Sequence, residues 1–120
     1  MYSNSPENQP IEQAAVFNQN GSAIDAGTSI LATDLVPKKP PSMFRVTVSM
    51  VKAGKFKVQL SQGATTIDMV FNNDVALAAY GIYTFEFLVS ENDTAINFEQ
   101  DQADQTINLL VVQEILVGAQ

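Results

Sequence analysis

The chain has 120 residues, a hydrophobic fraction of 46% and a formal net charge of −7, and it contains no Cys, His or Trp. This length indicates one domain that is large enough to bury a core. The missing Cys and His exclude disulfides, cysteine nucleophiles and any catalytic triad that needs a histidine from the same chain. We therefore expect a protein that is not an enzyme and uses no cofactor, and we assign no catalytic, cofactor-binding or metal-binding residue.

The first residues are mostly Asn, Gln, Ser, Pro and Glu. This composition predicts a flexible N-terminal arm over residues 1–13, followed by one β-sandwich domain over residues 14–120. The arm either stays disordered or orders on a neighbouring subunit. It has no basic segment leading into an apolar one, so we expect no signal peptide. The longest apolar run, residues 75–80, is far shorter than the ~20 residues of a membrane helix.

Strands are predicted wherever apolar residues alternate or cluster between turn-forming residues. In chain order they cover residues 14–17, 28–31, 44–51, 55–61, 66–71, 75–79, 82–89, 94–99 and 105–116. The proline-rich residues 37–41 suit an extended crossover, and Asn72-Asn73-Asp74 suits a turn. This pattern predicts an all-β, antiparallel two-sheet sandwich, jelly-roll-like, with about eight strands. An immunoglobulin-like topology stays open, although its Cys–Trp–Cys hallmark is absent.

A hairpin is predicted where the strands at residues 44–51 and 55–61 follow each other closely. A three-residue loop, Lys52-Ala53-Gly54, sets the apolar residues of the two strands opposite one another, whereas a two-residue loop would not. Gly54 then occupies the position of such a loop that favours a left-handed backbone.

The cationic residues all lie between Leu35 and Ile67, a window without any carboxylate. They are Lys38, Lys39, Arg45, Lys52, Lys55 and Lys57. The window carries +6 and the rest of the chain −13, which gives the net charge of −7. In the predicted hairpin, Arg45, Lys55 and Lys57 share one face. Such a basic pole can steer the protein toward an acidic surface.

These six cations, together with Glu86, form the candidate interface. Glu86 lies between two phenylalanines of a strand, where it could meet the basic hairpin of another copy. The simpler interpretations are a solvated basic sheet face that guards an edge, and the polar face of a half-buried strand for Glu86. A pI near 4.2 makes nucleic acid an unexpected partner. Two acidic loops, around Asp101 and Asp93, read as solvated loops rather than Ca²⁺ sites.

Residues 75–89, VALAAYGIYTFEFLV, and residues 93–98, DTAINF, resemble small β-sandwich virion proteins of tailed bacteriophages and related viruses. This group includes the decoration or cement proteins of the head, and the resemblance extends in style over residues 14–116. It implies a structural protein that is made in the host cytoplasm and located in the virion, without nucleic acid or membrane as its partner. Its expected partners are copies of itself, often as a trimer, and a major capsid protein. The alternative is a glycan- or receptor-binding β-sandwich module of a phage tail or cell surface, against which the missing Trp counts.

Overall fold

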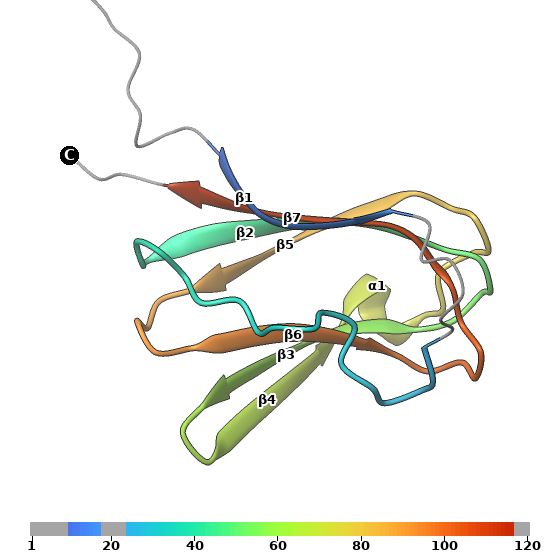
Figure 1. The fold of residues 1–120 in the computed structure, drawn as a ribbon, viewed down its shortest axis with the longest axis horizontal. Helices are drawn as coiled ribbons and strands as arrows, with labels where there is room; N and C mark the ends of the chain where they lie inside the picture. The colour runs from blue at the N-terminus through green and yellow to red at the C-terminus, as the bar shows by residue number, and fades with distance from the viewer. Residues whose placement is uncertain (1–9, 18–23, 117–120) are drawn as a thin grey trace, which may run out of the picture.

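The computed structural model describes residues 10–17 and 24–116, and these residues form two antiparallel sheets packed face to face (Figure 1). The first sheet has the strand order β1-β7-β2-β5, and the second has the order β4-β3-β6. The strands are β1 (Pro10–Phe17), β2 (Ser42–Met50), β3 (Phe56–Gln62), β4 (Thr65–Val70), β5 (Tyr83–Val89), β6 (Ala95–Gln100) and β7 (Ile107–Leu116). The predicted all-β sandwich is confirmed.

The strand order is that of a jelly roll in which one strand is replaced by an irregular segment. Residues 24–36 run along the edge of β6, where Leu35 and Ile96 exchange backbone hydrogen bonds of 2.9 and 2.8 Å. The N–H of Ile30 donates to the carbonyl of Phe98 at 2.8 Å. Counting this segment as the second of eight strands, the two sheets have the orders 1-8-3-6 and 2-7-4-5. That arrangement belongs to the double-sheet jelly rolls.

The core lies between the two sheets and follows from the period of two along each strand. Alternate residues of the central strands are buried, namely Phe44, Val46 and Val48 of β2, Phe56 and Val58 of β3, Ile96 and Phe98 of β6, and Leu110 and Val112 of β7. Stacked phenylalanines fill the middle of the core. Phe56 and Phe98 have ring centroids 5.4 Å apart, and Phe44 and Phe87 are 5.5 Å apart. Full burial of each such side chain contributes about 1.5–3 kcal/mol.

The predicted hairpin of residues 44–61 is wrong. β2 pairs with β5 and β7 in the first sheet, whereas β3 pairs with β4 and β6 in the second. The link Lys52-Ala53-Gly54 crosses from one sheet to the other. Gly54 does not have the left-handed backbone that was predicted, and it exchanges backbone hydrogen bonds of 3.1 and 2.7 Å with Leu77. Both strands do bury the predicted residues, because the two sheets face the same core.

Three further segments differ from the prediction. β1 begins at Pro10 and pairs with β7, so residues 10–13 belong to a sheet rather than to an arm, while residues 1–9 lie outside the described residues. Residues 28–31 form bends, and residues 75–79 form a single bridge through Leu77 instead of a strand.

The predicted turn at Asn72-Asn73-Asp74 is confirmed, within the segment α1 (Phe71–Asp74). All three turn residues have positive φ, a backbone region that Asn and Asp tolerate better than most residues. This turn directs the Phe71 ring between the sheets, where it stacks on Phe85 with centroids 4.6 Å apart. Within the described residues, no helix has the length and apolar character needed to cross a membrane.

Candidate interaction surface

The two lateral sides of the sandwich differ in how their strand edges are covered. On one side, residues 24–36 lie against β6 and bond to it. On the opposite side, β4 pairs with β3 alone and β5 with β2 alone among the described residues, so each presents a free edge (Figure 1). We call β4, β5 and the groove between them the open side. Every residue of β4 is exposed, which sets this strand apart from the other six.

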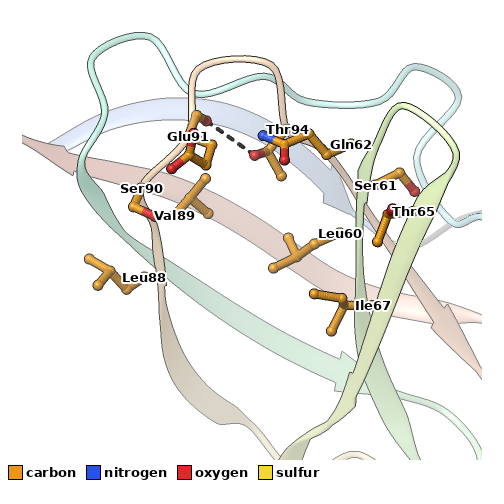
Figure 2. Close-up of a pocket in the computed structure, with 10 residues that line it drawn as sticks. All are labelled: Leu60, Ser61, Gln62, Thr65, Ile67, Leu88, Val89, Ser90, Glu91 and Thr94. Atoms are coloured by element: carbon orange, nitrogen blue, oxygen red, sulfur yellow. Dashed lines mark hydrogen bonds between the residues drawn. The ribbon is translucent and has the colours of Figure 1, made fainter.

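An apolar groove of about 190 Å³ lies within the open side (Figure 2). Leu60 and Ile67 line it from β3 and β4, and Val89 lines it from β5, whereas Leu88 lies at its rim with the side chain directed away from it. Ile67 is 55% exposed and Leu88 is 58% exposed. The turn after β5 closes one end of the groove. Large apolar side chains that gather around a hollow in this way mark an association surface more often than a solvated one.

Ile67 and Met69 of β4 are exposed although they point to the inner face of their sheet. Their cross-strand partners are Leu60 and Val58, and Val58 is fully buried. The first sheet ends at β5, where the rings of Phe85 and Phe87 contact Phe71, and Phe87 also contacts Phe98 of β6. Since every residue of β4 is exposed, no described strand covers its inner face.

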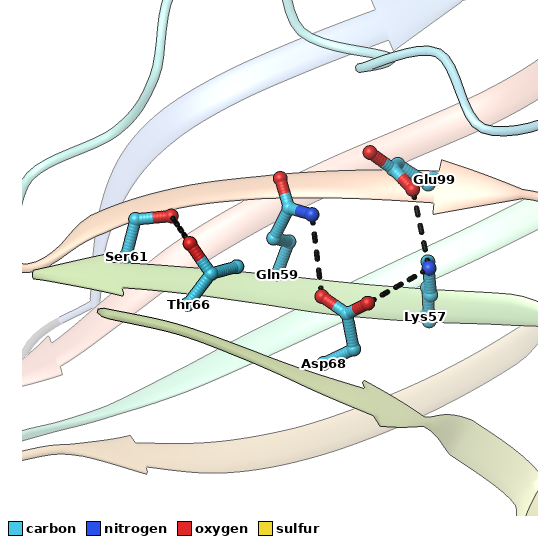
Figure 3. Close-up of polar contacts among 6 residues, drawn as sticks. All are labelled: Lys57, Gln59, Ser61, Thr66, Asp68 and Glu99. Atoms are coloured by element: carbon cyan, nitrogen blue, oxygen red, sulfur yellow. Dashed lines mark hydrogen bonds and ion pairs between the residues drawn. The ribbon is translucent and has the colours of Figure 1, made fainter. Parts of the chain in front are cut away.

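The outer face of β3 and β4 carries a network of paired charges (Figure 3). Lys57 Nζ lies 3.0 Å from Asp68 Oδ2 and 3.2 Å from Glu99 Oε1, and Gln59 donates to Asp68 Oδ1 at 3.2 Å. The hydrogen bond to Asp68 raises the pKa of Lys57, and burial of the ammonium group opposes this effect. The same hydrogen bond lowers the pKa of Asp68. The one charge of β4 is thus compensated within the chain.

The predicted face shared by Arg45, Lys55 and Lys57 does not form, because the three residues do not lie on one hairpin. Arg45 lies on the outer face of the first sheet, opposite Glu86 of the same chain, and its Nη2 is 2.9 Å from Glu86 Oε2. Lys57 lies on the second sheet. Lys55 Nζ is 3.1 Å from Asp74 Oδ1. The role of these residues in binding another copy stays a prediction, and the structure shows them paired with acids of their own chain.

The remaining cations are also separated. Lys52 Nζ donates to the carbonyl of Ala103 at 3.0 Å. Lys38 and Lys39 act through their backbone, since both N–H groups donate to the carboxylate of Glu114. The crossover that carries these two lysines is therefore held against β7.

Glu114 is a fully buried carboxylate that sequence analysis missed. It accepts a 2.6 Å hydrogen bond from Ser42 Oγ, bonds of 2.9–3.0 Å from the N–H groups of Lys38 and Lys39, and one of 2.8 Å from Gln13 Nε2. Burial raises the pKa of Glu114, but these hydrogen bonds outweigh it and the pKa is lowered overall. The ionised side chain ties β1, the crossover and β2 to β7.

The acids that were predicted to lie in solvated loops make local contacts. Asp101 accepts a hydrogen bond of 2.8 Å from the N–H of Lys55, and Glu91 accepts one from Thr94 through its carbonyl. Across residues 10–17 and 24–116, no three Asp or Glu side chains gather as a metal site would require.

Comparison of the chain with known protein families, with curated proteins and with solved structures finds no match. The geometry itself defines the class: a two-sheet sandwich in jelly-roll order, with the β6 edge covered by residues 24–36 and an open, apolar side along β4 and β5 among the described residues.

Proposed function

We propose that this chain is a non-enzymatic structural protein of a virion, of the head decoration or cement type, which binds a capsid lattice and associates with copies of itself. The observation that carries this proposal is the open side of the sandwich. There, Ile67 is exposed beside a groove that Leu60 and Val89 also line, and Met69 is exposed further along the same strand, although a monomer in water gains nothing by exposing them together. A protein that works by docking on other proteins needs such a surface.

The fold is compatible with this role but does not select it. Jelly-roll sandwiches occur in capsid proteins and in lectins, and a fold by itself does not define a function. The resemblance of residues 75–89 and 93–98 to virion proteins favours the capsid over the lectin. So does the pairing of Arg45 and Lys57 with acids of the same chain, because it leaves apolar contact as the main source of affinity.

The charges then have a different role from the one that the sequence suggested. Exposed ion pairs such as Arg45–Glu86 contribute about 0–1 kcal/mol each. They neutralise the outer sheet faces locally, while the net charge of −7 keeps separate molecules apart in solution. Docking through the apolar open side should accordingly become stronger, not weaker, as salt screens this repulsion.

A glycan- or receptor-binding module is the rival function. Sugar rings commonly stack on aromatic side chains, yet the groove of the open side is lined by aliphatic and polar residues and contains no aromatic side chain. Exposed aromatic side chains lie outside this groove, at Phe17 and Tyr80, and a glycan array with reproducible hits would establish the rival.

The proposed function is tested on particles produced by the genome that encodes this chain. Purified particles should contain the protein in a fixed ratio to the major capsid protein by quantitative mass spectrometry. Cryo-electron microscopy of the same particles should place the sandwich on the outside of the head. Absence of the protein from the particles, or its location at the tail tip alone, would overturn the proposal.

A further inference from the structure

We propose that the open side binds a second copy of this chain through β4, as an antiparallel β4–β4 pair with Ile67 on the two-fold axis. Each copy contributes a three-stranded sheet, and the pairing would unite them into one continuous sheet of six strands. The inference deepens the proposed function, because it names the partner and the geometry of self-association.

The backbone of β4 has hydrogen-bonding groups that point away from its sheet. β3 and β4 are joined by the two-residue loop Gly63-Ala64, and Gly63 has φ +60, as the first position of a type II′ turn requires. Gln62 and Thr65 close this loop as a hydrogen-bonded pair. Because such pairs alternate along an antiparallel ladder, the N–H and C=O groups of Thr66 and Asp68 are directed outward.

Among residues 10–17 and 24–116, nothing gives this edge the protection that natural sheets give to edges that stay free. Such edges usually carry lysines, prolines or bulges, or are covered by another segment. β4 has the sequence TTIDMV and pairs with β3 in a regular register. Its one charge, Asp68, is bound by Lys57 at 3.0 Å. By contrast, the other edge of the same sheet is covered by residues 24–36, which bond to β6.

Symmetry restricts how two β4 strands can pair. If the inner faces of both sheets stay on the same side, the two-fold axis lies midway between one residue and the same residue of the second copy. Ile67 and Asp68, at the centre of β4, are the two candidates for that residue. An axis at Asp68 sets two carboxylates directly opposite, which is destabilising. An axis at Ile67 sets isoleucine against isoleucine, Thr66 against Asp68, and Thr65 against Met69.

The Ile67 register also satisfies the free backbone groups. Thr66 and Asp68, whose N–H and C=O groups point outward, become hydrogen-bonded partners of each other across the axis. Ile67 forms a pair without backbone hydrogen bonds, in which the two Cα atoms lie about 4.5 Å apart and the side chains are closest. The exposed surface of Ile67, and part of that of Met69, is covered by the second copy. Charge, hydrogen bonding and apolar contact therefore select the same register.

Cysteine cross-linking tests both the contact and its register, because the native chain has no cysteine to interfere. A Cα separation of about 4.5 Å lies within the range of disulfides, which is about 4.4–6.8 Å. Ile67→Cys should form a disulfide dimer under mild oxidation at micromolar concentration, as read on a non-reducing gel. Asp68→Cys should cross-link much less, and Asn108→Cys, which is exposed on β7, serves as the matched control for random collision.

Dominant cross-linking of Asp68→Cys would overturn the register, and equal cross-linking of all three variants would overturn the contact. Sedimentation equilibrium of the unmodified protein supplies an independent result. We expect a monomer–dimer equilibrium whose dissociation constant is lower at high salt than at low salt. A monomer at all concentrations would overturn the proposal.

Substitution separates the β4 edge from the groove beside it. Ile67→Lys should abolish the dimer with an unchanged circular dichroism spectrum, because the side chain is exposed in the single copy. Leu88→Lys, with similar exposure on β5, should leave the dimer intact. The reverse pattern would refute pairing through β4. Detection of the protein in virions would be unaffected by any of these results, so failure of the pairing and failure of the proposed function remain distinguishable.

Discussion

Replacement of Glu114 by Gln should destabilise the protein by about 3 kcal/mol at neutral pH. Oε2 accepts hydrogen bonds from Ser42 Oγ and from the N–H groups of Lys38 and Lys39, and an amide oxygen can take over these three. The new NH₂ group then replaces Oε1, where it faces the donors Gln13 Nε2 and Lys38 N–H. The bond from Gln13 Nε2 is lost, and the Lys38 N–H keeps only its bond to the amide oxygen. Each of these two hydrogen bonds to a charged acceptor is worth about 1.5–3 kcal/mol.

Urea unfolding followed by circular dichroism measures this difference at several pH values. The hydrogen bonds lower the pKa of Glu114 below its ordinary value of 4.5, so the folded state favours the ionised form. Stability from this carboxylate is fully present above pH 4.5 and declines as the pH falls through the lowered folded-state pKa. The Gln variant has no such group. The difference in free energy of unfolding between the native protein and the variant should therefore become smaller below pH 4.5.

Glu86→Gln is the matched control, because Glu86 is an exposed acid whose ion pair with Arg45 contributes about 0–1 kcal/mol. The reasoning would be refuted if Glu114→Gln lowered the free energy of unfolding no more than Glu86→Gln does. It would also be refuted if the loss in the free energy of unfolding for Glu114→Gln were the same at pH 7 and pH 3.

Three other changes test the fold. Gly54→Val should cost about 1–3 kcal/mol in urea unfolding by overpacking, because a Cβ would lie 2.7 Å from Gln102 Cγ, and an unchanged midpoint would contradict this crowding. Deletion of residues 1–13 should lower the melting temperature relative to deletion of residues 1–9, since the longer cut removes half of β1; equal melting temperatures would show that the paired residues add no stability. Phe71→Ala should cost about 2–4 kcal/mol by calorimetry, because its ring stacks on two other phenylalanines, and a near-neutral effect would argue against that packing.

Strand positions could be predicted from the sequence because alternation is a local property. Phe44, Val46 and Val48 repeat at every second position, and any sheet that buries one of them buries the others. The partner of a strand is not local. β2 and β3 satisfy the register of a three-residue hairpin equally well, yet each has two better neighbours that come later in the chain. The hairpin was wrong for that reason, and the shared basic face was wrong with it.

The charges show the same limit at the level of single residues. Arg45 pairs with Glu86, which lies 41 residues further along the chain, and no spacing rule connects the two. For Glu114 a signal did exist. It has the same parity along β7 as Leu110 and Val112, so an acid stood at a position that the pattern assigned to the core. Nothing in the sequence indicated that Ile67 would be exposed. Alternation along the strand predicts that its side chain points inward, but it does not predict that no described strand lies opposite β4.

The segment over residues 24–36 has a consequence for the size of any assembly. Its hydrogen bonds to β6 cover one edge of the second sheet, so β4 is the edge of this sheet that stays free among the described residues. A sheet with two free edges can add copies without limit and grow into a fibre, whereas a sheet with one can be extended once. Growth through this sheet therefore terminates at a pair, so further order in a lattice must come from contacts made elsewhere on the molecule.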